Sequence, residues 1–144
     1  MYQLPCDYHV TATAEAGSNV VLKAEEVPQL VTAACVDAGG HGNQWCPEML
    51  LIAAVMDGLM VGFNAIARTS EFEWNTMSCR AIGTLDRVGK VNRFTSFRLT
   101  FTLNLPQGAD TEKARRLVQK AQVACVIANS LHGETDLEIE IVEE

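Results

Sequence analysis

Cysteines are the residues of this 144-residue chain best suited to nucleophilic or redox chemistry. Cys46 stands directly before Pro47 and Glu48, and Pro followed by an acidic residue marks the start of a helix. The positive end of the helix dipole would favour the reactive thiolate form of Cys46. A passive cysteine is the commoner case, so both interpretations of Cys46 stay open.

The five cysteines, at positions 6, 35, 46, 79 and 125, are an odd number without a C-x-x-C pair. They indicate neither a disulfide scaffold nor a zinc site, and we expect reduced thiols. Cys125 falls on the apolar stripe of a predicted helix, where a cysteine usually packs as a small hydrophobic residue. The three histidines have no ligand spacing and no glycine-rich phosphate loop is present, so neither a metal nor another cofactor is predicted.

Asp57 interrupts an otherwise apolar run in the predicted helix 47–68. An ionised carboxylate is costly in such surroundings unless it is paired or protonated. One interpretation places Asp57 in a pocket near Cys125, with its pKa raised by desolvation. The alternative places it at a partly wet edge or beside an arginine.

Both helices and strands are predicted to position these residues. The helix 47–68 is apolar around its circumference, which predicts burial on all sides, partly by a second subunit. A membrane span is disfavoured because polar and glycine residues interrupt the run near its middle. We predict one α+β domain over residues 1–144 with a hairpin at 8–14 and 19–24, a long loop at 25–45, strands at 79–85, 93–103 and 135–142, and a second helix at 110–128.

Composition, net charge and the first residues limit the expected binding partners and the expected cellular location. Hydrophobic residues at 48% and charged residues at 20% are typical of a globular protein. A net charge of -7 argues against nucleic acid or an anionic membrane surface as partner, because both select for basic patches. The first residues show no secretory signal, so a cytoplasmic location is expected.

Four segments resemble the OsmC/Ohr family of osmotically inducible and organic hydroperoxide resistance proteins. Residues 39–55 (GGHGNQWCPEMLLIAAV) are similar to its glycine-rich loop and W-S-P-E-x-L-L-x-A-A-V helix start. Residues 78–85 resemble its E-C-x-A-x-G-T-L strand, residues 93–95 its R-F-T strand start, and residues 120–131 its K-A-x-x-x-C-x-I-x-N-S-L helix. The order and spacing agree from about residue 25 onward.

The resemblance implies an OsmC-like α+β fold in which antiparallel sheets wrap long central helices of an intertwined homodimer. Peroxidases of the family attack an organic hydroperoxide with a cysteine eleven residues after the helix-start proline. A later helix cysteine then resolves the sulfenic acid as a disulfide, which dithiols reopen. A glutamate beside the proline and an arginine nearer the N-terminus organise the attacking thiolate.

Only some of the site residues of the resembling family are present in this sequence. Glu48 matches the glutamate and Cys125 the resolving cysteine, but Gly58, preceded by Asp57, occupies the attacking position. The arginine is also missing, because the first arginine of the chain is Arg68. Loss of the nucleophile should abolish two-cysteine turnover.

We therefore predict an oxidative-stress protein of this family that keeps the fold but lacks two-cysteine peroxidase activity. It would bind a small apolar ligand in a pocket at the dimer interface, and whether it is an enzyme stays open. The first alternative is a residual peroxidase that reduces organic hydroperoxides through Cys125 or Cys46. The second is a non-enzymatic interaction protein.

Overall fold

The computed structural model describes residues 2–144, which fall into two compact units, Met1–Leu50 and Leu51–Glu144. Each unit is described by itself. The prediction of a single domain over residues 1–144 stays a prediction.

The first unit is built on a small antiparallel sheet of strands β1 (Thr11–Thr13), β2 (Val20–Lys23) and β3 (Leu30–Thr32). Gly17, at φ 76°, lies in the turn between β1 and β2, so the predicted hairpin is confirmed. The predicted long loop contains β3 and the short 3-10 helix η1 (Val36–Ala38). An isolated parallel bridge joins Thr32 to Trp45 and brings the end of the loop back to the sheet.

Helix α1 (Pro47–Thr69) confirms the predicted central helix and its start at Pro47. Within the single chain only one face of the helix is buried, and the expectation that a second subunit covers the rest stays a prediction. One stripe is buried, made of Val55, Leu59, Phe63 and Ala67. The helix is long and apolar enough to cross a membrane, but this stripe makes it a core helix of the second unit.

The second unit contains the sheet β4-β5-β6, with β4 (Thr76–Val88) and β5 (Val91–Leu105) forming a long antiparallel hairpin. Strand β6 (Glu134–Glu143) pairs with β5 in parallel, so the expectation of purely antiparallel sheets is wrong. The physical reason is the helical crossover between the two strands, which returns the chain to the end of the sheet where β5 began.

The predicted helix 110–128 is two helices, α2 (Thr111–Val123) and α3 (Val126–Asn129). The side chain of Asp110 caps α2 by accepting a hydrogen bond of 2.8 Å from the backbone N–H of Lys113. The chain leaves the helical conformation at Cys125, which is the N-cap of α3. The break therefore sets the direction of the Cys125 side chain.

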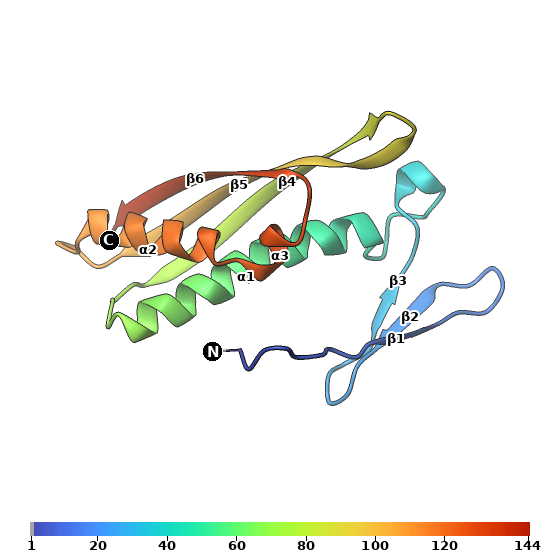
Figure 1. Ribbon diagram of the computed structural model, residues 1–144, viewed down its shortest axis with the longest axis horizontal. Helices are drawn as coiled ribbons and strands as arrows, with labels where there is room; N and C mark the ends of the chain where they lie inside the picture. Colours follow the sequence, from blue (N-terminus) through green and yellow to red (C-terminus); the bar gives the residue numbers. More distant parts are fainter. Residues whose placement is uncertain (1) are drawn as a thin grey trace. The chain divides into compact units, whose positions relative to one another are not determined.

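Alternation along β5 defines the core of the second unit. Phe97, Leu99, Phe101, Leu103 and Leu105 point to one face and are at most 1% exposed. Helices α1 and α2 cover that face, both on the same side of the sheet (Figure 1).

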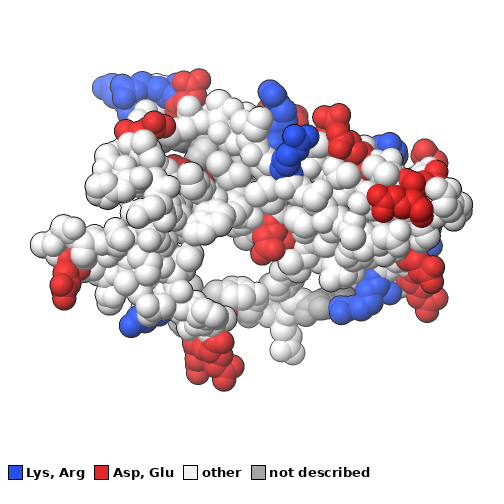
Figure 2. All heavy atoms as spheres, turned by 180° about the vertical axis from the view of Figure 1, so that it is seen from behind, with Lys and Arg blue, Asp and Glu red and all other residues white. Residues whose placement is uncertain are grey.

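The opposite face of β6 carries an exposed row of acidic residues, as the alternation predicts. The row is Glu134, Asp136, Glu138 and Glu140. On the face of the molecule drawn in Figure 2, the Lys and Arg side chains lie interspersed with Asp and Glu.

Candidate functional site

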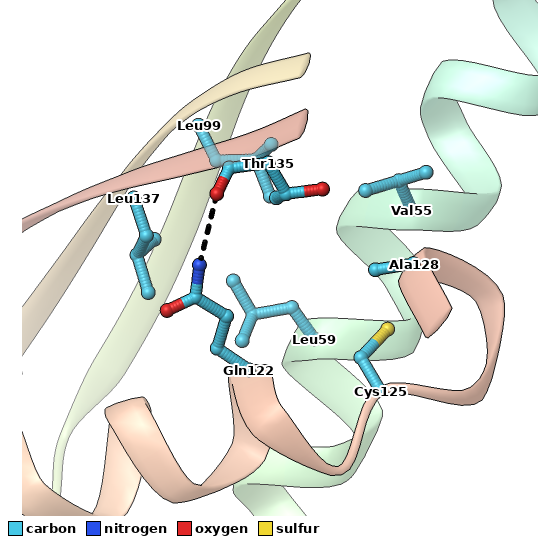
Figure 3. Close-up of a pocket in the computed structure, with 8 residues that line it drawn as sticks. All are labelled: Val55, Leu59, Leu99, Gln122, Cys125, Ala128, Thr135 and Leu137. Carbon is cyan, nitrogen blue, oxygen red and sulfur yellow. Dashed lines mark hydrogen bonds between the residues drawn. The ribbon is translucent and has the colours of Figure 1, made fainter. Parts of the chain in front are cut away.

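A small apolar cavity in the second unit contains Cys125 (Figure 3). Its volume is about 10 Å³, which is room for about one water molecule. The side chain of Gln122 bounds it by donating a hydrogen bond of 3.3 Å to the carbonyl oxygen of Thr135. The lining residues are Val55, Leu59, Leu99, Gln122, Cys125, Ala128, Thr135 and Leu137.

Gly58 of α1 faces Cys125 directly. A Cβ atom added to Gly58 would lie 3.0 Å from the sulfur of Cys125 and 3.4 Å from Cγ1 of Ile127. Within a disulfide, a Cβ and the far sulfur are about 3 Å apart, given an S–S bond of about 2.05 Å. The backbone therefore holds position 58 at disulfide distance from Cys125, but residue 58 has no side chain.

Asp57 does not face this cavity, which corrects the prediction of a pocket carboxylate. It is exposed and is not one of the lining residues. Successive residues of an α-helix point about 100° apart, since the helix has 3.6 residues per turn. Gly58 takes the direction toward Cys125, so Asp57 points toward solvent, on the same side as Val61 and Asn64.

A second sulfur cluster lies in the first unit, where Cys35 and Cys46 form a disulfide with their Cα atoms 5.2 Å apart. The expectation of reduced thiols is wrong for this pair. Cys35 is partly exposed and begins η1, whereas Cys46 is fully buried and precedes the first residue of α1. One signal of this pairing is present in the sequence, because the two cysteines enclose a loop with three glycines.

The glycines bend this loop so that it closes on Cys35. The carbonyl oxygen of Cys35 accepts backbone hydrogen bonds from Ala38 and Gly40, each 2.9 Å long. A side chain at Gly40 would collide with the carbonyl oxygen of Ala34, so only glycine fits there. Gly39 has φ 93°, in the left-handed region that favours glycine.

Glu48 lies beside this disulfide. Its Oε2 atom is 3.1 Å from the sulfur of Cys35. A disulfide sulfur carries no hydrogen, so this contact becomes a hydrogen bond only when Cys35 is reduced and its thiol can donate. Cys35, Cys46 and Glu48 also place three potential metal-ligand atoms within 4.8 Å of one another, but binding would require both sulfurs as thiolates.

The other free cysteines, among the described residues, are Cys6 and Cys79. Cys6 is exposed. Burial raises the pKa of Cys79 to about 11, so this thiol is protonated and a poor nucleophile at neutral pH.

Comparison with known proteins agrees with this architecture. The sequence profile of OsmC-like proteins matches residues 40–140, so the chain belongs to the OsmC-like family. No curated protein matches the chain.

Several solved structures share the fold. An OsmC-like protein of unknown function from Vibrio cholerae has a TM-score of 0.81 at 16% identity, over 93% of this chain and 99% of that chain. An OsmC-like protein from Mycoplasma pneumoniae has a TM-score of 0.82 at 12% identity, over 96% and 99%. An organic hydroperoxide resistance protein from Elizabethkingia anophelis, with thiocyanate bound, has a TM-score of 0.74 at 18% identity, over 98% and 100%.

Proposed function

We propose that this chain is an oxidative-stress protein of the OsmC family that has lost two-cysteine hydroperoxide reduction. The observation that carries the proposal is the geometry at position 58, where an added Cβ would lie 3.0 Å from the sulfur of Cys125. The resolving cysteine of the resembling peroxidases is retained and the place for the attacking cysteine is formed, but Gly58 supplies no thiol. Without a nucleophile the hydroperoxide O–O bond is not attacked at this site.

The working form in this proposal is a cytoplasmic homodimer. Val61 on the outer face of α1 is 61% exposed, and Ile82 and Val91 of the β4–β5 hairpin are each 63% exposed. Large exposed apolar side chains favour a protein partner, and a second copy with two-fold symmetry is the commonest one.

The same site would bind a small apolar ligand rather than turn over a peroxide. Support comes from the lining of the Cys125 cavity, which is mostly aliphatic. The cavity of a single chain holds only about one water molecule, so the ligand pocket would be completed by the second subunit.

The decisive experiment restores the thiol with Gly58→Cys. Wild type should show almost no consumption of tert-butyl or cumene hydroperoxide with dithiothreitol, and Gly58→Cys should gain measurable turnover. Mass spectrometry of the peroxide-treated variant should find a disulfide between positions 58 and 125. Turnover should stay weak, because no arginine precedes Arg68 to stabilise the new thiolate.

Gly58→Ser is the matched control, because it fills the same space without a redox-active sulfur. Robust wild-type turnover that survives replacement of both Cys125 and Cys46 would overturn the proposal. Wild-type turnover that disappears in Cys125→Ser would instead establish the residual peroxidase.

A further inference from the structure

We infer that Cys35 and Cys46 form a reversible dithiol–disulfide exchange site whose substrate is an external dithiol. In this site Cys35 is the sulfur that is attacked and Cys46 is the sulfur that leaves. The inference does not involve Gly58 or Cys125.

Exposure decides which sulfur is attacked. Thiol–disulfide exchange requires an incoming thiolate to reach one sulfur of the disulfide. Cys46 is 0% exposed, whereas Cys35 is partly exposed and is followed by Val36, which is 64% exposed. An incoming thiolate therefore reaches Cys35 first.

The helix start decides which sulfur leaves. Cys46 directly precedes α1, and its carbonyl oxygen accepts the backbone N–H of Leu50 at 3.0 Å. The free N–H groups of the first helical turn and the helix dipole stabilise negative charge at this position. The carboxylate of Glu48 lies 3.1 Å from the sulfur of Cys35 and within 4.8 Å of that of Cys46, so its repulsion is strongest at Cys35 and a leaving thiolate is more stable on Cys46.

Glu48 acts as a positioning residue for the reduced state. Once Cys35 carries a proton, its thiol can donate to Oε2 of Glu48 across that 3.1 Å contact. The carboxylate thus favours Cys35 as the neutral thiol while the helix start favours Cys46 as the thiolate. This arrangement favours different protonation states for the two reduced sulfurs.

The exchange balances in two steps. A thiolate of the dithiol bonds to Cys35, the Cys35–Cys46 bond breaks, and its electron pair leaves on Cys46. The second thiol of the reagent loses its proton to solvent and attacks its own bound sulfur, which releases Cys35 as a thiolate that takes a proton from water. The dithiol is oxidised by two electrons to a disulfide, and the protein disulfide is reduced by two electrons.

The proposed location supports a redox role over a structural one. Disulfides in cytosolic proteins are usually transient and catalytic or redox-sensing. The pair also closes a loop that already has its own backbone hydrogen bonds, from Ala38 and Gly40 to Cys35, so the loop fold does not depend on the disulfide alone.

The test uses the wild-type full chain in native buffer. The oxidised protein is treated with glutathione, quenched with acid, alkylated and mapped by mass spectrometry. We expect the glutathione adduct on Cys35 in at least tenfold excess over Cys46. With dithiothreitol, both cysteines should become alkylatable at a rate within tenfold of that measured in urea, and the folded circular dichroism spectrum should persist.

Three results would overturn the inference. One is a disulfide that is reduced at least a hundredfold more slowly in the folded protein than in urea, as a purely structural bridge would be. Another is a glutathione adduct mainly on Cys46. The third is a reduced protein whose Cys35 and Cys46 do not pair again when oxidised dithiothreitol is added.

Discussion

Glu48 is the residue whose charge the exchange site depends on. Replacing Glu48 by Gln removes a negative charge 3.1 Å from the sulfur of Cys35. Two like charges at this distance repel by at least about 1 kcal/mol even in water, which is a factor of about five to ten in the thiolate population and so in the alkylation rate. In reduced protein at neutral pH, we expect iodoacetamide to alkylate Cys35 about five to ten times faster in Glu48→Gln.

Glu25→Gln is the control for net charge, because Glu25 is an exposed acidic residue of the same unit. It should leave the alkylation rate of Cys35 unchanged. An equal acceleration in both variants would mean that net charge, not the contact, sets the rate.

The half-buried thiol of Cys79 should make the unfolding free energy fall at alkaline pH. Its pKa is raised by burial to about 11 from the ordinary value of 9.0, so the folded state holds the proton more tightly than the unfolded state. The contribution is complete below pH 9 and is lost as the pH rises through 11. The difference in unfolding free energy between wild type and Cys79→Ala, measured in urea, should shrink over this range.

A difference that stays constant from pH 8 to pH 11 would contradict the assigned pKa. Other groups titrate in the same range, but they are common to both proteins and cancel in the difference.

The contact of α1 with β4 is the element-scale feature most sensitive to a single methyl group. A Cβ on Gly83 would lie 2.8 Å from Cδ1 and Cγ1 of Ile52 and 3.0 Å from Phe94. We expect Gly83→Ala to lower the unfolding free energy by about 1–3 kcal/mol, the usual cost of overpacking. The cost should fall in an Ile52→Ala background, which a double-mutant cycle measures.

Gly62→Ala is the opposite case within the same unit. Its Cβ would meet only Ala121, at an ordinary 3.9 Å, and alanine stabilises a helix interior by about 0.5–1 kcal/mol over glycine. A similar destabilisation by both substitutions would show that glycine is needed for reasons other than space.

Local patterns predicted these elements well and their pairing poorly. The alternation of 97–103 and the Pro47 helix start are local signals, so β5 and α1 were predictable. The direction of β6 is not encoded by alternation, and Ala124 and Cys125 are not helix breakers, so the parallel pairing and the gap between α2 and α3 were missed.

In the candidate site, too, some features were predictable from local motifs and others depend on the folded chain. The family motifs alone predict that Gly58 and Cys125 lie opposite each other, as they do in the structure. The Cys35–Cys46 bond depends on bringing two Cα atoms eleven residues apart to 5.2 Å, and only the folded glycine loop does that. Asp57 was misplaced because an apolar run does not reveal which direction each position faces.

At the scale of the whole molecule, the proposed homodimer can be tested directly. We expect light scattering to give about twice the chain mass of 15.7 kDa. Val61→Glu, which puts a charge on an exposed apolar position of α1, should shift the protein toward monomer. Val123→Glu, at a 76% exposed position at the end of α2, should not. A wild type that is monomeric at micromolar concentration would exclude the dimer.

The parallel pairing of β5 with β6 has a consequence for the order in which the chain folds. Residues that meet across this pair are 38 positions apart, as Thr102 and Glu140 are, so we expect β6 to dock after the β4–β5 hairpin has formed. Until then, one backbone edge of β5 is unpaired and could template the wrong strand from another chain. The strand that finally covers this edge is lined with carboxylates on its outer face, and their mutual repulsion would keep the finished sheet from recruiting a further copy.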